Sequence, residues 1–150
     1  MKPRSLVLLL TLTLCLVSCE NRRPEEPFNE SAVLEVLQAQ EDAWNNGDIE
    51  GYMAGYWRSD SMRFAGGNNV SYGWDSTLAR YKRGFPTEEA MGRLSFEGVK
   101  IDAIDRSNAL AFGRWILEWE DRTRQGLFTL WFRKIDGAWK VVHDHTSVGG

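Results

Sequence analysis

The chain has 150 residues, of which 18 are basic and 21 are acidic, and its formal net charge is −3. Proteins that bind nucleic acid usually have the opposite balance, because lysine and arginine must neutralise phosphates, so we expect no nucleic-acid partner. The two cysteines, Cys15 and Cys19, both lie near the N-terminus, which leaves no thiol for a disulfide or a thiolate metal site in the rest of the chain. We therefore expect neither a metal nor a cofactor.

The N-terminal segment predicts export and lipidation. A short basic stub precedes an apolar run at 6–17, which is shorter than the roughly 20 residues that a membrane-spanning helix needs. This pattern is typical of a secretory signal. Its end, LVSC at 16–19, resembles the lipobox of bacterial lipoproteins, which implies cleavage before Cys19 and a lipid on that residue. The protein is then expected in the bacterial cell envelope, outside the cytoplasm and held to a membrane by its lipid. An ordinary signal peptide with a coincidental Cys19 is the alternative.

The mature chain is expected to contain a tether and one domain. Residues 1–18 are interpreted as the signal peptide, and 19–30, which are polar and include two prolines, as the tether. Residues 31–148 contain no internal repeat, so they predict a single domain.

Within this domain, helices come first and strands follow. Helical spacing of apolar residues predicts three helices, at 31–44, 49–57 and 75–83. Runs rich in β-branched and aromatic residues predict four strands, at 93–104, 109–120, 127–135 and 138–146. The last two strands are separated by Asp136-Gly137, a strong signal for a two-residue hairpin. This order of elements defines an α+β fold with an antiparallel sheet.

The hairpin also predicts the two faces of the sheet, because paired residues share a face. One face mixes polar and apolar residues: Phe112, Arg114, Ile116, Glu118, Thr129, Trp131, Arg133, Lys140, Val142 and Asp144. The other is almost entirely hydrophobic and ends in two histidines: Trp115, Leu117, Trp119, Phe128, Leu130, Phe132, Trp139, Val141, His143 and His145. Because three helices cover only one face, we expect the mixed face over the helices and the hydrophobic face against a second copy in a homodimer. The assignment of the strand at 109–120 depends on the loop at 121–126, where a one-residue bulge would exchange the two faces of that strand.

Two segments resemble a known family. The motif AWNNGD at 43–48, followed by Tyr56-Trp57, resembles the opening of the nuclear transport factor 2-like superfamily. The closing segment, 128–147, is similar to its SnoaL-like branch, which includes the association domain of calcium/calmodulin-dependent kinases. The resemblance covers 31–148 and implies a cystatin-like cone: a curved sheet wrapped around N-terminal helices, with a pocket at its open end and dimers through its convex face. The superfamily includes enzymes and non-enzymatic binders, so the fold leaves the function open.

Asp144 is the candidate catalytic residue. A carboxylic acid among aromatic side chains can have a raised pKa and act as a general base, and the resemblance implies isomerase, dehydratase or cyclase chemistry for such a site. The alternative is a structural ion pair between Asp144 and Arg114. Seven residues are expected to line the pocket: Tyr56, Trp57, Tyr81, Arg114, Glu118, Thr129 and Trp131. The aromatic members of this set serve equally well as core.

Two further features bear on the ligand. Arg114 matches an arginine in the pocket of the kinase association domains and can bind a carboxylate with two hydrogen bonds. Thr129 replaces a second arginine of those domains, which argues against acid binding.

His143 and His145 have a spacing that can bind metal, but the chain has only two histidines and we expect a structural role.

Three hypotheses therefore describe the function. The first, which we expect, is a lipid-anchored protein that binds a small apolar or weakly acidic molecule. The second is an enzyme that uses Asp144 as its base. The third is an envelope interaction protein whose pocket is filled by core side chains.

Overall fold

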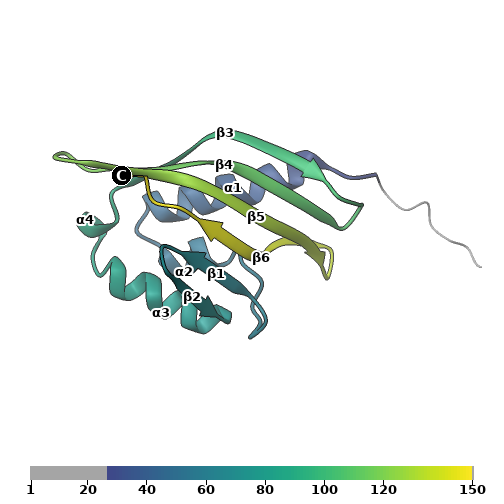
Figure 1. Ribbon diagram of the computed structural model, residues 1–150, viewed down its shortest axis with the longest axis horizontal. Coiled ribbons are helices and arrows are strands. Elements are labelled where there is room, and N and C mark those ends of the chain that lie inside the picture. The colour runs from purple at the N-terminus through teal and green to yellow at the C-terminus, as the bar shows by residue number, and fades with distance from the viewer. Residues whose placement is uncertain (1–26, 150) are drawn as a thin grey trace, which may run out of the picture.

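The computed structural model describes residues 27–149 (Figure 1). The expected signal peptide, the lipidation site Cys19 and most of the tether lie outside these residues. Among the helices of the described part, none combines the length and the apolar character that crossing a membrane requires.

The described residues form four helices: α1 (Glu30–Asn45), α2 (Ile49–Met53), α3 (Trp74–Gly84) and α4 (Glu88–Met91). All three predicted helices are present. Asp48 caps α2, because its side chain accepts a hydrogen bond from the amide of Gly51 at 2.8 Å. However, α2 ends earlier than predicted, and the chain turns toward the sheet, where the amide of Trp57 donates to the carbonyl of Val141 at 2.9 Å.

One sheet contains all the strands of the described residues: β1 (Arg63–Gly66), β2 (Asn69–Tyr72), β3 (Arg93–Ala103), β4 (Asn108–Glu118), β5 (Thr123–Ile135) and β6 (Ala138–Thr146). Their order is β2-β1-β6-β5-β4-β3. β1 runs parallel to β6, and the other neighbouring pairs are antiparallel. The β1–β2 hairpin is absent from the predicted strands because each of its strands has only four residues, too few to show a periodic pattern.

The predicted turn at Asp136-Gly137 joins β5 to β6. Both residues have positive φ, 51° and 84°, as this type of two-residue hairpin requires. β5 begins at Thr123, so much of the loop expected before it is strand. As a result, Leu127 lies opposite Arg114 and not opposite Glu120. Because this shift is an even number of residues, it leaves the composition of the two faces unchanged.

The predicted orientation of the sheet is wrong. Phe128, Leu130 and Phe132 are buried in the core beneath the helices. Arg114 and Thr129 alternate with them in register and lie on the outer face. The hydrophobic effect explains this orientation, because the helices remove the more apolar of the two faces from water within a single chain.

One residue of the mixed face nevertheless points inward. The pairing of β5 with β6 shifts between Trp131 and Phe132, which leaves Val142 as an extra residue of β6. A bulge of this kind exchanges the faces of the strand beyond it. Asp144 therefore shares the inner face with the hydrophobic core, and His143 lies on the outer face.

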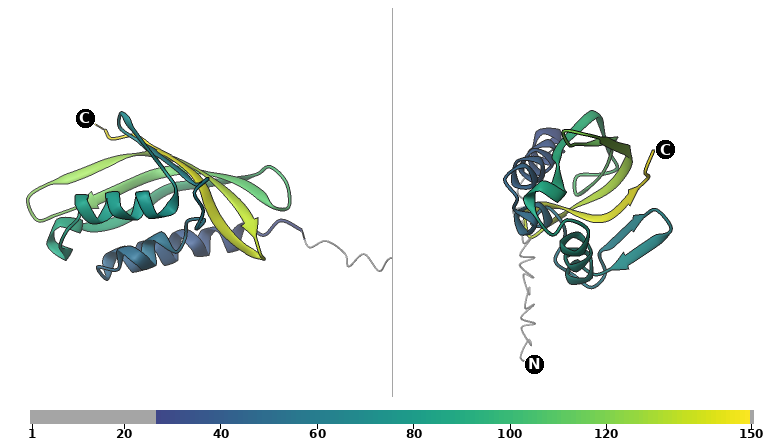
Figure 2. Two further views of the ribbon diagram at one scale, coloured as in Figure 1. Left: turned by 90° about the horizontal axis from the view of Figure 1, so that it is seen from below. Right: turned by 90° about the vertical axis from the view of Figure 1, so that its left-hand side faces the viewer.

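Figure 2 shows the curvature of the sheet, with β3, β4 and β5 arching over α1 and with α3 on the same side. The hydrophobic core fills the space between helices and sheet. The outer face keeps some large apolar side chains exposed: Leu110, Phe112 and Leu127. The molecule thus has the α+β, cone-shaped architecture expected from the sequence.

Candidate functional site

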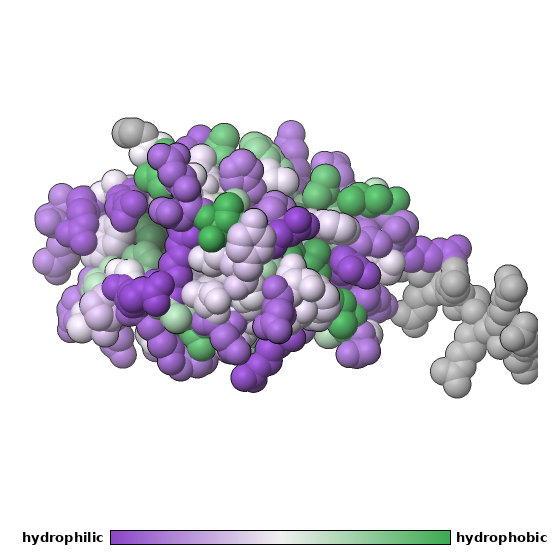
Figure 3. All heavy atoms as spheres, turned by 60° about the horizontal axis from the view of Figure 1, so that its bottom comes forward, coloured by the Kyte–Doolittle hydropathy of each residue, from purple (hydrophilic) through white to green (hydrophobic). Residues whose placement is uncertain are grey.

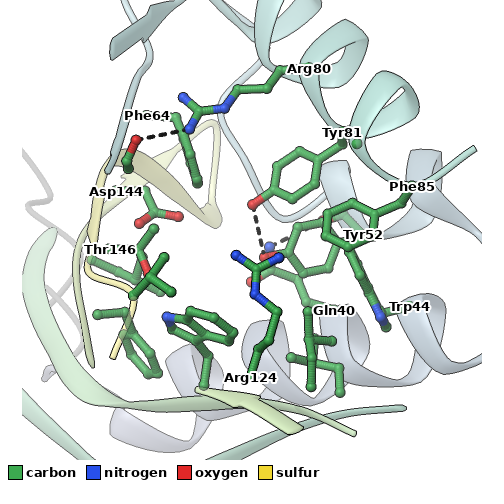
Figure 4. Close-up of a pocket in the computed structure, with 18 of the residues that line it drawn as sticks. Gln40, Trp44, Tyr52, Phe64, Arg80, Tyr81, Phe85, Arg124, Asp144 and Thr146 are labelled. Atoms are coloured by element: carbon green, nitrogen blue, oxygen red, sulfur yellow. Dashed lines mark hydrogen bonds between the residues drawn. The ribbon is translucent and has the colours of Figure 1, made fainter. Parts of the chain in front are cut away.

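A cavity of about 450 Å³ lies between the helices and the concave side of the sheet (Figure 4). Its lining is rich in aromatic residues: Trp44, Tyr52, Tyr56, Phe64, Tyr81, Phe85, Phe96, Trp115 and Phe128. Figure 3 shows apolar residues set back in a recess toward the left end of the molecule, with hydrophilic residues around it. Cavities of this size and composition enclose small, largely apolar molecules.

Three tyrosines form a hydrogen-bonded cluster in the cavity wall. Tyr52 lies on α2, Tyr56 lies just after the turn that ends this helix, and Tyr81 lies on α3. The hydroxyl oxygen of Tyr52 is 3.3 Å from that of Tyr56 and 3.4 Å from that of Tyr81. The rings of Tyr52 and Tyr81 also pack edge to face, with centroids 5.2 Å apart. This packing holds the three hydroxyl groups in place.

Asp144 projects into the same cavity from β6. Only 4% of its surface is exposed. The hydroxyl of Tyr56 donates a hydrogen bond to Oδ2 at 2.7 Å. The other carboxyl oxygen, Oδ1, is buried and has no hydrogen-bond partner among residues 27–149. Such atoms are rare in folded proteins because their desolvation is not compensated, so Oδ1 marks a position that a bound molecule would satisfy.

These surroundings raise the pKa values of Asp144 and of the three tyrosines, with different consequences for their charge at neutral pH. Burial raises the pKa of Asp144 from 3.8 to about 7, while the hydrogen bond from Tyr56 and the charge of Arg80 partly oppose this shift. Burial, followed by the nearby charge of Asp144, raises the pKa of Tyr52 to about 12. Burial likewise raises the pKa of Tyr56 and of Tyr81 well above the usual value. The tyrosines are therefore neutral hydrogen-bond donors, whereas Asp144 can exchange a proton near neutral pH.

Two arginines also line the cavity. Arg80, on α3, donates to the carbonyl of Gly66 at 3.0 Å, and its guanidinium lies over the ring of Phe64, 4.6 Å from the centroid. Arg124 belongs to the exposed beginning of β5, and Figure 4 shows its side chain extending from that strand into the cavity opening.

The structure brings three of the predicted site residues together. Asp144, Tyr56 and Tyr81 all line the cavity. Trp57, which was also predicted to line the pocket, is half-buried and does not line the cavity. The reason is the early end of α2, after which Trp57 is no longer in phase with the helical face that carries Tyr52.

Four predicted lining residues lie on the outer face instead: Arg114, Glu118, Thr129 and Trp131. Their predicted place in the pocket is wrong because the sheet presents its other face to the helices. Arg114 donates to the side-chain oxygen of Gln125 at 3.2 Å. The alternative ion pair between Arg114 and Asp144 is also ruled out, since the two residues lie on opposite faces.

Sequence reasoning missed several lining residues: Tyr52, Phe64, Arg80, Trp115, Arg124 and Phe128. Trp115 and Phe128 belong to the face that the sequence analysis assigns to a partner. Tyr52 carries a usable signal, because it precedes Tyr56 by one turn on an amphipathic segment. Arg80 carries none, since its contacts depend on the β1–β2 hairpin.

The histidines lie outside the cavity. His143 and His145 are opposite Trp131 and Thr129 on the outer face. Burial lowers the pKa of His143, and the charges of Arg63 and His145 lower it further. Residues 27–149 contain no group of three or more histidine, cysteine, aspartate or glutamate side chains arranged to hold a metal ion.

The fold and the cavity together define a cone-shaped α+β domain with a pocket that is rich in aromatic residues and open to the surface. Residues 33–149 match the SnoaL-like domain family, and the chain belongs to that family. It is similar to an NTF-2-like protein of unknown function from Shewanella oneidensis MR-1, with 37% sequence identity, a TM-score of 0.75, and coverage of 78% of this chain and 97% of that chain. No curated protein matches the chain.

Two other solved structures extend the comparison. A domain of unknown function with a cystatin-like fold from Nostoc punctiforme PCC 73102 is 25% identical, with a TM-score of 0.65 and coverage of 81% of this chain and 77% of that chain. A ketosteroid isomerase-like protein from Erwinia carotovora atroseptica SCRI1043 is 19% identical, with a TM-score of 0.65 and coverage of 82% and 99%. These likenesses confirm the predicted cystatin-like fold, and at 19% identity the second shows the fold alone.

Proposed function

We propose that this protein binds a small, largely apolar molecule that carries a hydroxyl group or another hydrogen-bond donor. The observation that carries the proposal is the unpartnered Oδ1 of Asp144 inside a cavity rich in aromatic residues. The aromatic walls supply apolar contact, and the single buried carboxyl group supplies orientation. Small-molecule sites commonly combine these two elements.

The energetics favour a donor at Asp144. A net hydrogen bond to a charged group contributes about 1.5 to 3 kcal/mol, and an unsatisfied buried acceptor costs a similar amount. A ligand hydroxyl pointing at Oδ1 therefore gains the bond and removes the cost. Tyr56 strengthens this preference, because it already donates to Oδ2 and orients the carboxyl group.

A matched pair of probes tests this role. At pH 8, 2-naphthol is expected to bind roughly tenfold more tightly than naphthalene, which has the same ring system without a donor. Fluorescence titration gives both dissociation constants. Asp144→Leu removes the acceptor while keeping an apolar cavity, so the preference should fall to about one. Asp102→Leu, on exposed β3, should preserve it.

The outcome also depends on pH in a defined direction. The ionised carboxylate is the stronger acceptor, so the preference for 2-naphthol should decline as pH falls through about 7, the pKa of Asp144. Failure of the protein to bind either probe would refute the proposal. Equal affinity for both probes at pH 8 would also refute it.

A second candidate function is proton-transfer catalysis, as an isomerase, dehydratase or cyclase. It is favoured by the pKa of Asp144, about 7, which suits a general base at neutral pH. Oδ1 would take a proton from a carbon next to a carbonyl group, and the electrons of the broken C–H bond would move onto the carbonyl oxygen. The neutral hydroxyls of Tyr52 and Tyr81 line the same cavity and would donate hydrogen bonds to that oxygen.

Deuterium exchange separates the two functions. The ketone 2-tetralone, placed in D₂O with the protein, should exchange its α-hydrogens faster than the background rate if Asp144 acts as a base. Mass spectrometry measures the exchange, and Asp144→Leu should abolish the acceleration. Binding of 2-tetralone without accelerated exchange would leave the binding role and reject this catalytic role.

The lipid anchor and the homodimer remain proposals of the same kind. Lipidation is supported by the LVSC motif at 16–19, and we propose that the lipid would hold the cavity near a membrane surface of the cell envelope. A dimer is supported by the exposed apolar side chains of the outer face: Leu110, Phe112 and Leu127.

A further inference from the structure

Two guanidinium groups flank the cavity and have no acidic partner. Arg80 comes from α3 and Arg124 from β5, and with Asp144 they are the charged side chains in the cavity lining. Within residues 27–149, no carboxylate lies within salt-bridge distance of Arg80 or Arg124. The cavity therefore has two distinct polar elements, an unsatisfied acceptor on Asp144 and positive charge from the two arginines.

Arg80 is held in place by its neighbours. It donates to the carbonyl of Gly66 at 3.0 Å and to the hydroxyl of Ser71 at 3.4 Å, while its guanidinium lies over the ring of Phe64. These two hydrogen bonds leave further N–H donors of the five that a guanidinium carries. The positive charge of Arg80 reaches into the cavity, since it lowers the pKa of Asp144. Arg80 is thus a fixed, partly buried donor at the wall.

Arg124 is placed differently. It lies near the start of β5, opposite Leu117 of β4, and Figure 4 shows its side chain extending from β5 into the pocket. Its side chain is exposed, so it can adapt to the position of an anion. One arginine is therefore fixed by the fold and the other is adjustable.

These charges discriminate between ligand classes. An aromatic cavity with one carboxylate would suit an organic cation, but the two guanidinium groups in the lining oppose a further positive charge. A neutral apolar ligand would leave both arginines without an acidic partner. An acidic group would pair with them, and guanidinium groups match carboxylates with two parallel hydrogen bonds.

We propose that the ligand is an amphipathic organic acid, whose anionic group binds between Arg80 and Arg124 while its hydroxyl end donates to Asp144. This inference rests on the proposed function and adds the substrate class. The residues that support an acidic ligand are Arg80 and Arg124. Arg114, which the sequence suggested for this role, lies on the outer face.

Hydroxy acids matched to neutral phenols test the inference. The pairs are 4-hydroxybenzoate with phenol, and 6-hydroxy-2-naphthoate with 2-naphthol, so that two separations between hydroxyl and carboxylate are sampled. At least one acid should bind roughly fivefold more tightly than its phenol in low salt, as expected for partly exposed ion pairs. The gain should shrink at high salt, because mobile ions screen exposed charges.

Arginine variants locate the effect. Arg124→Gln should remove most of the gain for the acid and leave the affinity for the matched phenol unchanged. Arg80→Gln should act in the same direction. Arg83→Gln, an exposed position of α3 outside the cavity lining, is the control and should preserve the gain. Circular dichroism confirms that each variant is folded.

The outcomes distinguish the two proposals. If the phenols bind through Asp144 but neither acid gains affinity, the acid class is overturned and the proposed function stands. If an acid gains affinity equally in the wild type and in both cavity variants, the site between the arginines is likewise refuted. If neither phenols nor acids bind, the proposed function itself fails.

Discussion

Removal of the buried charge at Asp144 should change how the stability of the protein depends on pH. Burial raises the pKa of this carboxyl group from 3.8 to about 7 in the folded protein, so the folded state binds a proton more tightly than the unfolded state does. An acid with a raised pKa makes the folded state less stable as pH rises above its unfolded value. This loss begins near pH 4 and levels off above pH 7.

The magnitude follows from the size of the shift. One pKa unit corresponds to 1.36 kcal/mol, so the full penalty at high pH is about 4 kcal/mol. Between pH 5 and pH 8 the penalty grows by about 2 to 3 kcal/mol, because part of it is already present at pH 5. Asp144→Asn removes the ionisable group and should remove this component.

Urea unfolding at pH 5 and pH 8 measures the effect. The free energy of unfolding of Asp144→Asn, relative to that of the wild type, should rise by about 2 to 3 kcal/mol between these pH values. Asp102→Asn removes an exposed carboxylate of β3 and should show no comparable change. Suppose instead that the free energy of unfolding of Asp144→Asn differs from that of the wild type by the same amount at both pH values. That result would refute the raised pKa of Asp144 and, with it, the general-base proposal.

Four other expectations concern the packing of the core, the outer face of the sheet and the attachment to a membrane. Phe132→Ala should lower the free energy of unfolding by about 3 to 5 kcal/mol in urea titrations, since Phe132 has no exposed surface and its loss leaves a cavity. Gly126→Ala should lower the melting temperature measured by circular dichroism and expose the C-terminal segment to protease, because the added Cβ would lie 1.9 Å from the carbonyl oxygen of Ser147. Phe112→Glu should yield monomers in analytical ultracentrifugation if the outer face forms the dimer, and an unchanged dimer would exclude that face. Cys19→Ala should release the protein from membranes in fractionation, and persistent attachment would contradict the lipid anchor.

The sequence predicted the elements of the domain well because their signals are local. Helical spacing marked α1 and α3, and Asp136-Gly137 marked the β5–β6 hairpin. Errors arose where local signals were weak: the β1–β2 hairpin is too short for a periodic pattern, and the chain leaves α2 before Trp57. The β4–β5 turn was misplaced because polar residues of β5 resemble a loop.

The candidate site was only partly accessible from the sequence. Asp144 was selected as an acid among aromatic residues, and Tyr56 and Tyr81 as aromatic residues of the helices. The register argument placed Asp144 in the pocket together with Arg114 and Thr129. Those two residues lie on the outer face of the sheet instead. One extra residue in β6, Val142, brings Asp144 to the hydrophobic face, and no periodicity in the sequence marks that bulge.

The sequence by itself determined the class of fold and the alternation of side chains along the strands, because these depend on neighbours along the chain. The tertiary structure alone decided which face of the sheet meets the helices, since that choice depends on the total apolar area that the helices can cover. It also decided that Arg80 and Arg124 line the same cavity. The two residues belong to segments far apart in the sequence, where no spacing rule applies.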